Sequence, residues 1–168
     1  MTEVLLGVGS NIDRERYITL GLDALADLLG ELRLSPVYDS VAIGFEGQPF
    51  LNLVVQAYTE LPLRDLATRL RAIEKAHGRP ENATRFSSRH LDIDILTFGD
   101  LSGDHQGVVL PRPEILENAF VLRPLADLVP ESRHPVDGRT YAALWRAYDQ
   151  TSQALERVRF SWRGSVFS

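Results

Sequence analysis

The sequence predicts an α+β fold, in which an antiparallel sheet carries two helices on one of its faces. Four stretches have the apolar runs or the alternation of strands, and two have apolar residues at the three- and four-residue spacing of helices. They follow one another as strand, helix, strand, strand, helix, strand. The 168 residues, 44% hydrophobic and 24% charged, fit one folded domain of ordinary size spanning 1–168.

The first half of this order comprises a strand, a helix and a second strand. Val4–Gly9 is an apolar run that ends in turn residues, which is typical of a buried strand. An amphipathic helix is expected from Asp13 to the stop at Gly30. Its buried stripe comprises Ile18, Leu22, Leu25 and Leu29. Leu32–Asp39 predicts the second strand, and the Gly- and Pro-containing stretch Ser40–Pro49 predicts a loop.

The second half repeats the pattern. Apolar and polar residues alternate over Leu51–Tyr58, which predicts a strand with one buried face. A helix is expected from Pro62 to Gly78, and a fourth strand over Leu91–Leu96. This is the split order of ferredoxin-like folds, with both helices on one face of the sheet and the other face free for a ligand.

The remaining chain is expected to pack on this core, which spans about residues 1–130, as an extension over 131–168. An apolar stretch covers Ala119–Val129, and a short helix is expected near Tyr141–Tyr148. The tail after Ser152 contains Phe160, Trp162 and Phe167. These aromatic residues indicate that it either covers an apolar edge or contacts another subunit.

Composition excludes several classes of function. The absence of cysteine removes disulfides, thiolate metal sites and thiol nucleophiles, and the four scattered histidines lack zinc-site spacing. No apolar stretch reaches the roughly 18 residues of a membrane span and no signal peptide is evident, so we expect a cytoplasmic protein without a membrane partner. The net charge of −5 argues against nucleic-acid binding. We expect a monomer or a weak homodimer.

Two aspartates in the fourth strand are the first candidates for chemistry. Asp92 and Asp94 are two residues apart, so they face the same side while Leu91, Ile93 and Ile95 face the core. Paired carboxylates repel unless a cation lies between them, and hard oxygen ligands suit magnesium completed by substrate phosphates. The alternative is a solvated strand face that carries two acidic residues by chance.

Three arginines precede this pair. Arg79, Arg85 and Arg89 lie in a segment rich in loop residues, which would bring guanidinium groups next to the carboxylates. Cations beside metal ligands indicate a polyphosphate substrate, because phosphoryl-type transfer depends on positioning and charge neutralisation. The alternative is that these arginines pair with Asp92, Asp94 or Glu81.

Two aromatic residues indicate a second, flat substrate. Phe50 and Phe120 could enclose a heterocycle, with the amide of Asn52 supplying a donor and an acceptor at its edge. By default, either phenylalanine is a core residue and Asn52 a turn residue.

Together these residues resemble the 6-hydroxymethyl-7,8-dihydropterin pyrophosphokinase family of folate biosynthesis. The resemblance spans about the first 130 residues, and the known fold of the family is ferredoxin-like. The matching motifs are Gly9-Ser-Asn11, Gln48-Pro-Phe-Leu-Asn52, Ile73-Glu74 with Gly78-Arg79, Arg89-x-x-Asp92-x-Asp94, and Pro111 through Ala119-Phe120 to Pro124-Leu125.

The resemblance implies transfer of diphosphate from ATP, a co-substrate, to a pterin alcohol, with release of AMP. It implies that Asp92 and Asp94 hold two Mg²⁺ ions and that, with Arg79 and Arg89, they carry catalysis. The implied ATP-binding residues are Arg71, Glu74, Arg79, Arg85, Arg89, Ile95 and Arg112. The implied pterin-binding residues are Ser40, Ile43, Gly44, Phe50, Asn52, Asp92 and Phe120.

Several positions differ from the usual family pattern, mostly on the ATP side. They are Glu81, Ser87, Gly107, Arg112 and Asn118. Arg112 keeps a cation near the phosphates, whereas Glu81 and Asn118 each stand where the family has an arginine. The alternative function is therefore a paralogue that binds a pterin-like ligand with lost or altered ATP chemistry. A ferredoxin-like sensor or nucleic-acid module is a weaker third alternative.

Overall fold

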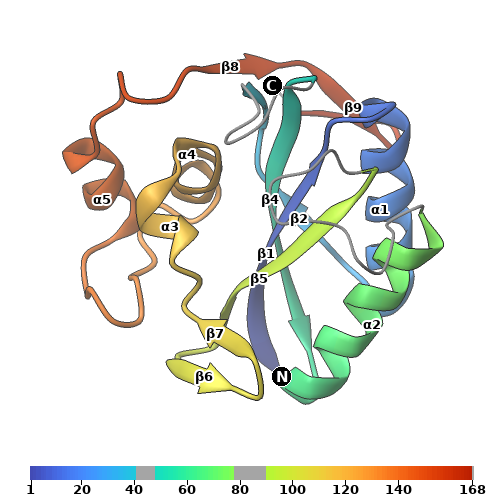
Figure 1. Ribbon diagram of the computed structural model, residues 1–168, viewed down its shortest axis with the longest axis horizontal. Helices are drawn as coiled ribbons and strands as arrows, with labels where there is room; N and C mark the ends of the chain where they lie inside the picture. Colours follow the sequence, from blue (N-terminus) through green and yellow to red (C-terminus); the bar gives the residue numbers. More distant parts are fainter. Residues whose placement is uncertain (41–47, 78–89, 168) are drawn as a thin grey trace.

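The protein folds into three layers, with an antiparallel sheet between two groups of helices (Figure 1). The computed structural model describes residues 1–40, 48–77 and 90–167. Its strands are β1 (Thr2–Ser10), β2 (Arg33–Leu34), β3 (Val37–Ser40), β4 (Phe50–Thr59), β5 (Asp92–Phe98), β6 (Gly103–His105), β7 (Val108–Leu110), β8 (Leu155–Val158), β9 (Phe160–Trp162) and β10 (Ser165–Phe167). Its helices are α1 (Arg14–Leu29), α2 (Leu63–Ala76), α3 (Glu114–Glu117), α4 (Ala119–Leu128) and α5 (Tyr141–Ala147).

The main sheet has the order β5-β1-β4-β3-β8, and β2 also pairs with β4. All of these pairs are antiparallel. The second predicted strand is interrupted, because β2 and β3 are separated by Ser35 and Pro36. Proline has no amide hydrogen for the ladder. Ser35 instead exchanges two hydrogen bonds with the backbone of Val54, accepting at Oγ (2.8 Å) and donating from its own amide (2.9 Å).

One face of the sheet packs against α1 and α2, as the helical periodicity predicts. Ile18, Leu22 and Leu25 of α1 are fully buried in the larger core cluster. Leu66 and Leu70 of α2 join it, and their sheet partners are the alternate residues Leu51, Leu53, Val55 and Ala57 of β4 with Ile93 and Ile95 of β5. Gly30 ends α1 with a φ of 81°, the conformation that favours glycine at this position.

The opposite face is covered in part by later helices, so the prediction of a free face is wrong for that part and holds only around Asp92 and Asp94. Leu5, Val54 and Leu96 point to this side and are buried in a second cluster with residues of α3, α4 and α5. Figure 1 shows these helices on the side of the sheet away from α1 and α2. Ala119–Leu128 is apolar on most of its surface, so it can bury itself only by packing on the exposed sheet.

The C-terminal tail lies along the edge of the sheet. β8 pairs with β3, and Phe160 is buried in the larger core cluster. The indole nitrogen of Trp162 donates to Asp23 Oδ1 of α1 at 3.0 Å. The tail therefore covers an edge, which was one of its two predicted positions. In the described part of the chain, no helix has the length and apolar character needed to traverse a bilayer.

Candidate active site

The two aspartates of β5 lie on the face of the sheet opposite α1 and α2. Asp92 pairs with Gly9 of β1 and Asp94 with Gly7, whereas Ile93 between them points into the core. The side chain of Asp94 is 39% exposed, so its carboxylate can be reached from solvent. The structure thus brings the predicted carboxylates together on one accessible patch.

Two glycines form the floor beside these carboxylates. Gly7 and Gly9 lie between β5 and β4, where Gly9 also pairs with Asn52. A Cβ atom built on Gly9 would lie 2.6 Å from Asn52 Oδ1, which shows how closely the amide lies over the glycine. Gly9 was predicted to end the first strand and to belong to a family motif, whereas Gly7 had no predicted role. Glycines at alternate positions inside a strand could have indicated this part of the site, because they mark places where a ligand or another part of the chain comes close to the backbone.

The far side of this floor brings three predicted pterin residues together. Ser40 pairs with Phe50 across β3 and β4, and Asn52 Nδ2 donates to Ser40 Oγ at 3.0 Å. Phe120 is in the first turn of α4, partly buried against the cluster that contains Val54. The predicted residues Ile43 and Gly44 lie outside the described residues.

Two side chains that the predictions did not assign to the site hold the start of β4. Arg14 donates to the carbonyl oxygen of Pro49 at 3.1 Å and forms an ion pair with Asp39 at 2.9 Å. Asn11 Nδ2 donates to the carbonyl oxygen of Gln48 at 3.1 Å. These contacts fix the backbone just before Phe50. They are long-range in sequence, so no local pattern could have indicated them.

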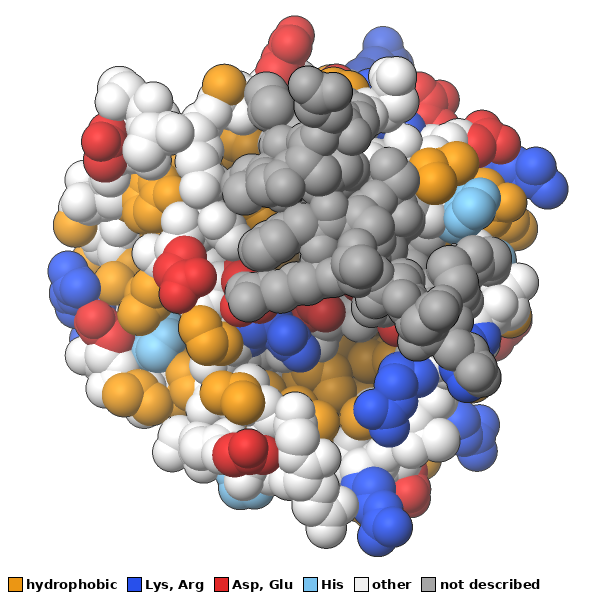
Figure 2. All heavy atoms as spheres, in the orientation of Figure 1, with side chains coloured by type: hydrophobic (Ala, Val, Ile, Leu, Met, Phe, Trp, Pro, Cys, Tyr) orange, Lys and Arg blue, Asp and Glu red, His pale blue; other side chains and the backbone are white. Residues whose placement is uncertain are grey.

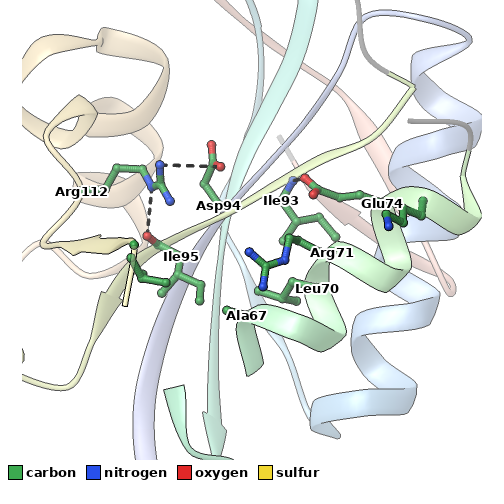
Figure 3. Close-up of a pocket in the computed structure, with 11 residues that line it drawn as sticks. Ala67, Leu70, Arg71, Glu74, Ile93, Asp94, Ile95 and Arg112 are labelled. Carbon is green, nitrogen blue, oxygen red and sulfur yellow. Dashed lines mark hydrogen bonds and ion pairs between the residues drawn. The ribbon is translucent and has the colours of Figure 1, made fainter. Parts of the chain in front are cut away.

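A pocket of about 300 Å³ opens beside Asp94, between α2, β5 and the β6–β7 hairpin (Figure 3). Figure 2 shows the hollow, with hydrophobic side chains at its base and basic side chains near its rim. Four predicted ATP-binding residues line it, and so does Asp94. The lining comprises Ala67, Leu70, Arg71, Glu74, Lys75, Ile93, Asp94, Ile95, Gly107, Val108 and Arg112.

A second hollow of about 320 Å³ continues the first toward the start of α2. The two share Ala67, Arg71, Gly107 and Val108. Together they form an elongated groove with an apolar base. Such a groove suits a ligand with a flat apolar part and a charged part.

Arg112 is the cation nearest to the aspartate pair among the described contacts. Its Nε donates to the carbonyl oxygen of Ile95 at 3.1 Å, and its backbone amide donates to the carbonyl oxygen of Leu96 at 2.9 Å. Its Nη1 lies 4.0 Å from Asp94 Oδ1 and 3.6 Å from Glu114 Oε2 (Figure 3). The guanidinium is thus held at the pocket wall, where it can contact an anion.

Glu74 lines the pocket and also joins α2 to β5. Its Oε2 accepts a hydrogen bond from the amide of Ile93 at 2.8 Å, and the residue is only 4% exposed. This contact is a structural link that the predicted nucleotide role did not include.

Part of the predicted site lies outside the described residues, namely Arg79, Arg85 and Arg89. Among the residues that are described, no group of three or more His, Asp or Glu side chains could hold a metal.

Comparison with known proteins identifies the family. A model of the 7,8-dihydro-6-hydroxymethylpterin-pyrophosphokinase (HPPK) family matches residues 5–130. A 2-amino-4-hydroxy-6-hydroxymethyldihydropteridine pyrophosphokinase of Pseudomonas aeruginosa is 42% identical over 141 residues, covering 81% of this chain and 85% of that protein. The protein of the same name from Aquifex aeolicus is 36% identical over 138 residues, covering 81% and 86%.

Solved structures agree on the fold. The crystal structure of wild-type Plasmodium falciparum HPPK-DHPS superimposes with a TM-score of 0.73 at 14% identity, covering 98% of this chain and 49% of that chain. This chain therefore spans about half the length of that protein. The family predicted from the sequence is confirmed: the chain belongs to the 7,8-dihydro-6-hydroxymethylpterin-pyrophosphokinase family.

Proposed function

We propose that this chain transfers the terminal diphosphate of ATP to the hydroxyl of 6-hydroxymethyl-7,8-dihydropterin, releasing AMP. As a family member it is an ATP-dependent diphosphotransferase of folate synthesis, and the names of its relatives favour this function over a paralogue without ATP chemistry. The observation that carries the proposal is the position of the aspartate pair. Asp92 and Asp94 lie between the glycine floor next to Asn52 and the pocket lined by Arg71 and Arg112.

In this proposal the pterin lies over the glycine floor. Phe50 and Phe120 contact its two faces, and the amide of Asn52 reads its edge. The hydrogen bond from Asn52 to Ser40 supports this role, because it fixes the orientation of the amide before the ligand binds. Ile43 and Gly44 would contribute from the loop.

ATP would occupy the groove beside α2. The apolar wall near Ile95 suits the base and sugar, and the guanidinium groups of Arg71 and Arg112 line the pocket where they could bind the phosphates. Arg79, Arg85 and Arg89 would add positive charge from the segment before β5. Since the chain has a net charge of −5, this local concentration of arginine matters for binding a triphosphate.

The donor set of Asp92 and Asp94 fits magnesium. Two carboxylates on one accessible strand face provide hard oxygen ligands and leave most positions for water and phosphate. Two such ions would neutralise the phosphates and bring the pterin oxygen close to the reacting phosphorus. Arg112, 4.0 Å from Asp94, would remain available for the phosphates.

The reaction is an in-line displacement at the β-phosphorus. The pterin hydroxyl oxygen forms the new bond, the bond to the bridging oxygen of AMP breaks, and the hydroxyl proton leaves to solvent. Arg79 and Arg89, with Arg112, would stabilise the negative charge that develops on the phosphate oxygens.

Several broader features are part of the same proposal. The strand order, in which the fourth and third predicted strands flank the first, supports a ferredoxin-like topology. We further propose one domain over 1–168, a cytoplasmic protein, and a monomer or weak homodimer.

The test is the release of AMP from ATP with magnesium and the pterin. We expect pterin-dependent AMP from the native protein and at least about a 100-fold lower rate from Asp94→Asn, which removes a charge but little volume. Asp100→Asn, in the exposed turn after β5, is the matched control and should retain the native rate. Full activity in Asp94→Asn would refute the assigned role. Pterin binding without AMP release would favour the paralogue.

A further inference from the structure

The C-terminal segment from Gln153 to Val158 contacts both walls of the proposed pterin site. It pairs with β3, where Leu155 faces Ser40 and Arg157 faces Tyr38. Its side chains also contact both ends of α4, the helix that carries Phe120. These residues lie beyond the part of the chain that the family model matches, 5–130.

The first contact is at the start of α4. Gln153 Oε1 accepts a hydrogen bond from the amide of Ala119 at 2.8 Å, and its Nε2 donates to Asn118 Oδ1 at 3.1 Å. The first amides of a helix have no partner within the helix, so a side chain that accepts from one of them fixes the helix start. Phe120 is the next residue.

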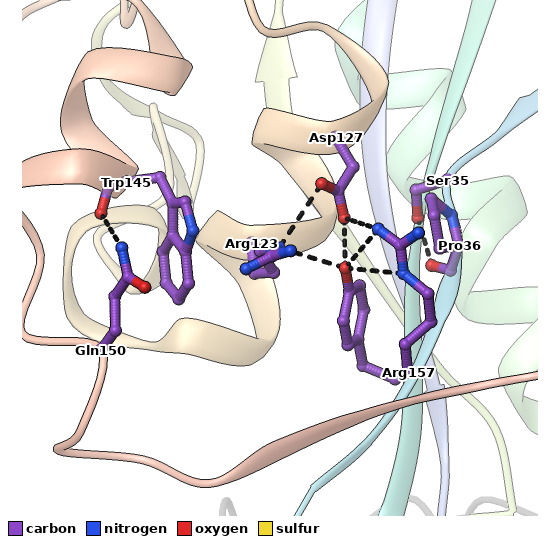
Figure 4. A network of polar contacts seen from close by, with 8 residues as sticks. Ser35, Pro36, Arg123, Asp127, Trp145, Gln150 and Arg157 are labelled. Atoms are coloured by element: carbon purple, nitrogen blue, oxygen red, sulfur yellow. Dashed lines mark hydrogen bonds and ion pairs between the residues drawn. The ribbon is translucent and has the colours of Figure 1, made fainter. Parts of the chain in front are cut away.

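The second contact is at the end of α4. Arg157 Nη2 donates to Tyr38 Oη at 3.0 Å and to Asp127 Oδ2 at 3.2 Å. Tyr38 Oη donates to the same carboxylate, and Arg123 Nε donates to Tyr38 Oη at 3.1 Å. Figure 4 shows Arg123 and Arg157 reaching this point from α4 and from β8.

The cluster around the Tyr38 hydroxyl is well suited to hold β3 and α4 at a fixed distance and orientation. Tyr38 is only 3% exposed, and its burial, then its bond to Asp127, raises its pKa, so it remains a phenol that can donate. Arg157 bonds to β3 and α4 through one guanidinium, whose planar geometry restricts both partners. Tyr38 also pairs with Asn52 of β4, so the cluster adjoins the proposed pterin contacts.

We propose that Gln153 and Arg157 are positioning residues for the pterin, which hold α4, and with it Phe120, at a fixed place above Ser40 and Asn52. The inference rests on the proposed function, because it assigns the tail a role at the same site. Neither residue lines the groove beside α2, so ATP binding should not depend on them.

The test compares Arg157→Ala with Arg163→Ala. Arg163 is in the same tail and has a similar ion pair, 3.1 Å to Asp23, but that partner is on α1, on the other face of the sheet. We expect Arg157→Ala to raise KM for the pterin about tenfold, equivalent to about 1.4 kcal/mol, and to leave KM for ATP within about twofold. Gln153→Ala should act in the same direction. Arg163→Ala should change neither constant.

A conservative variant separates positioning from general stability. Arg157→Lys keeps the charge but not the planar fork, so pterin KM should fall between the native and alanine values. Equal rises in both KM values, or a pterin KM unchanged in Arg157→Ala and Gln153→Ala, would overturn the proposal. If the native protein releases no AMP, the proposed function fails separately, and pterin affinity measured by calorimetry in the same variants still decides the positioning role.

Discussion

Adding one methyl group to the floor of the proposed site should disturb both stability and pterin binding. In Gly9→Ala, the new Cβ would lie 2.6 Å from Asn52 Oδ1, whereas Cβ atoms essentially never come within 3.0 Å of a neighbour. The amide must therefore move, and its hydrogen bond to Ser40 is lost or lengthened. Losing that bond costs about 1 kcal/mol and the strain about 1–3, against about 0.4–1 gained from lower entropy of the unfolded chain. We expect a net loss of about 1–3.6 kcal/mol.

Gly7→Ala is the matched control. Gly7 is in the same strand and on the same face, but its Cβ would lie 3.5 Å from a Leu96 methyl, an ordinary contact. Urea unfolding of both variants gives their stabilities, and pterin KM in the AMP assay reports on Asn52. We expect Gly7→Ala to keep the native unfolding free energy or to gain about 0.4–1 kcal/mol, and Gly9→Ala to lose stability and raise pterin KM about tenfold. Equal stability and equal pterin KM in both variants would refute the reasoning.

Two further predictions concern buried hydrogen bonds. Glu74→Leu should lower the unfolding free energy by about 1–3 kcal/mol, because the Ile93 amide loses its acceptor, while Glu74→Gln keeps an oxygen and most of the stability. Urea unfolding without nucleotide measures this, and equal loss in both variants would contradict it. Burial lowers the pKa of His134 from its ordinary 6.5, and its Nδ1 accepts from the amides of Val136 and Asp137. Below about pH 6.5 the folded protein therefore binds fewer protons than the unfolded chain. The stabilisation by neutral His134 is present above that pH and is lost as the pH falls below it. In thermal unfolding, the melting temperature of His134→Asn should fall less steeply with decreasing pH than that of the native protein.

Local patterns in the sequence predicted most of the frame of the site. The alternation in β5 placed Asp92 and Asp94 on one face and Ile93 on the other, because strand periodicity alone decides this. The helical stripe of α1 and its stop at Gly30 were predicted for the same reason. Such features depend only on residues within one element.

The features that were missed depend on contacts between elements. The face opposite α1 and α2 was predicted to be free from the order of strands and helices alone, and the helices that cover part of it come much later in the chain. The interruption of the second strand at Pro36 could have been predicted from the sequence, since proline interrupts the hydrogen-bond ladder of a strand. By contrast, the links from Arg157 to Tyr38 and from Arg14 to Pro49 join segments that only the folded chain brings together.

The two halves of the proposed site differ in what makes them vulnerable to mutation. The ATP side is made of side chains such as Arg71 and Arg112, so truncating them should weaken the site while leaving the core intact. The pterin side depends on Gly9 and on the half-buried amide of Asn52 packed over it, so added volume is the more damaging change there. The tail strengthens this contrast, because Arg157 acts on the pterin side only through α4 and β3. Variants that raise pterin KM alone should therefore include an addition at Gly9 and truncations in the tail, two changes that reach the site through neighbouring residues of β3 and β4.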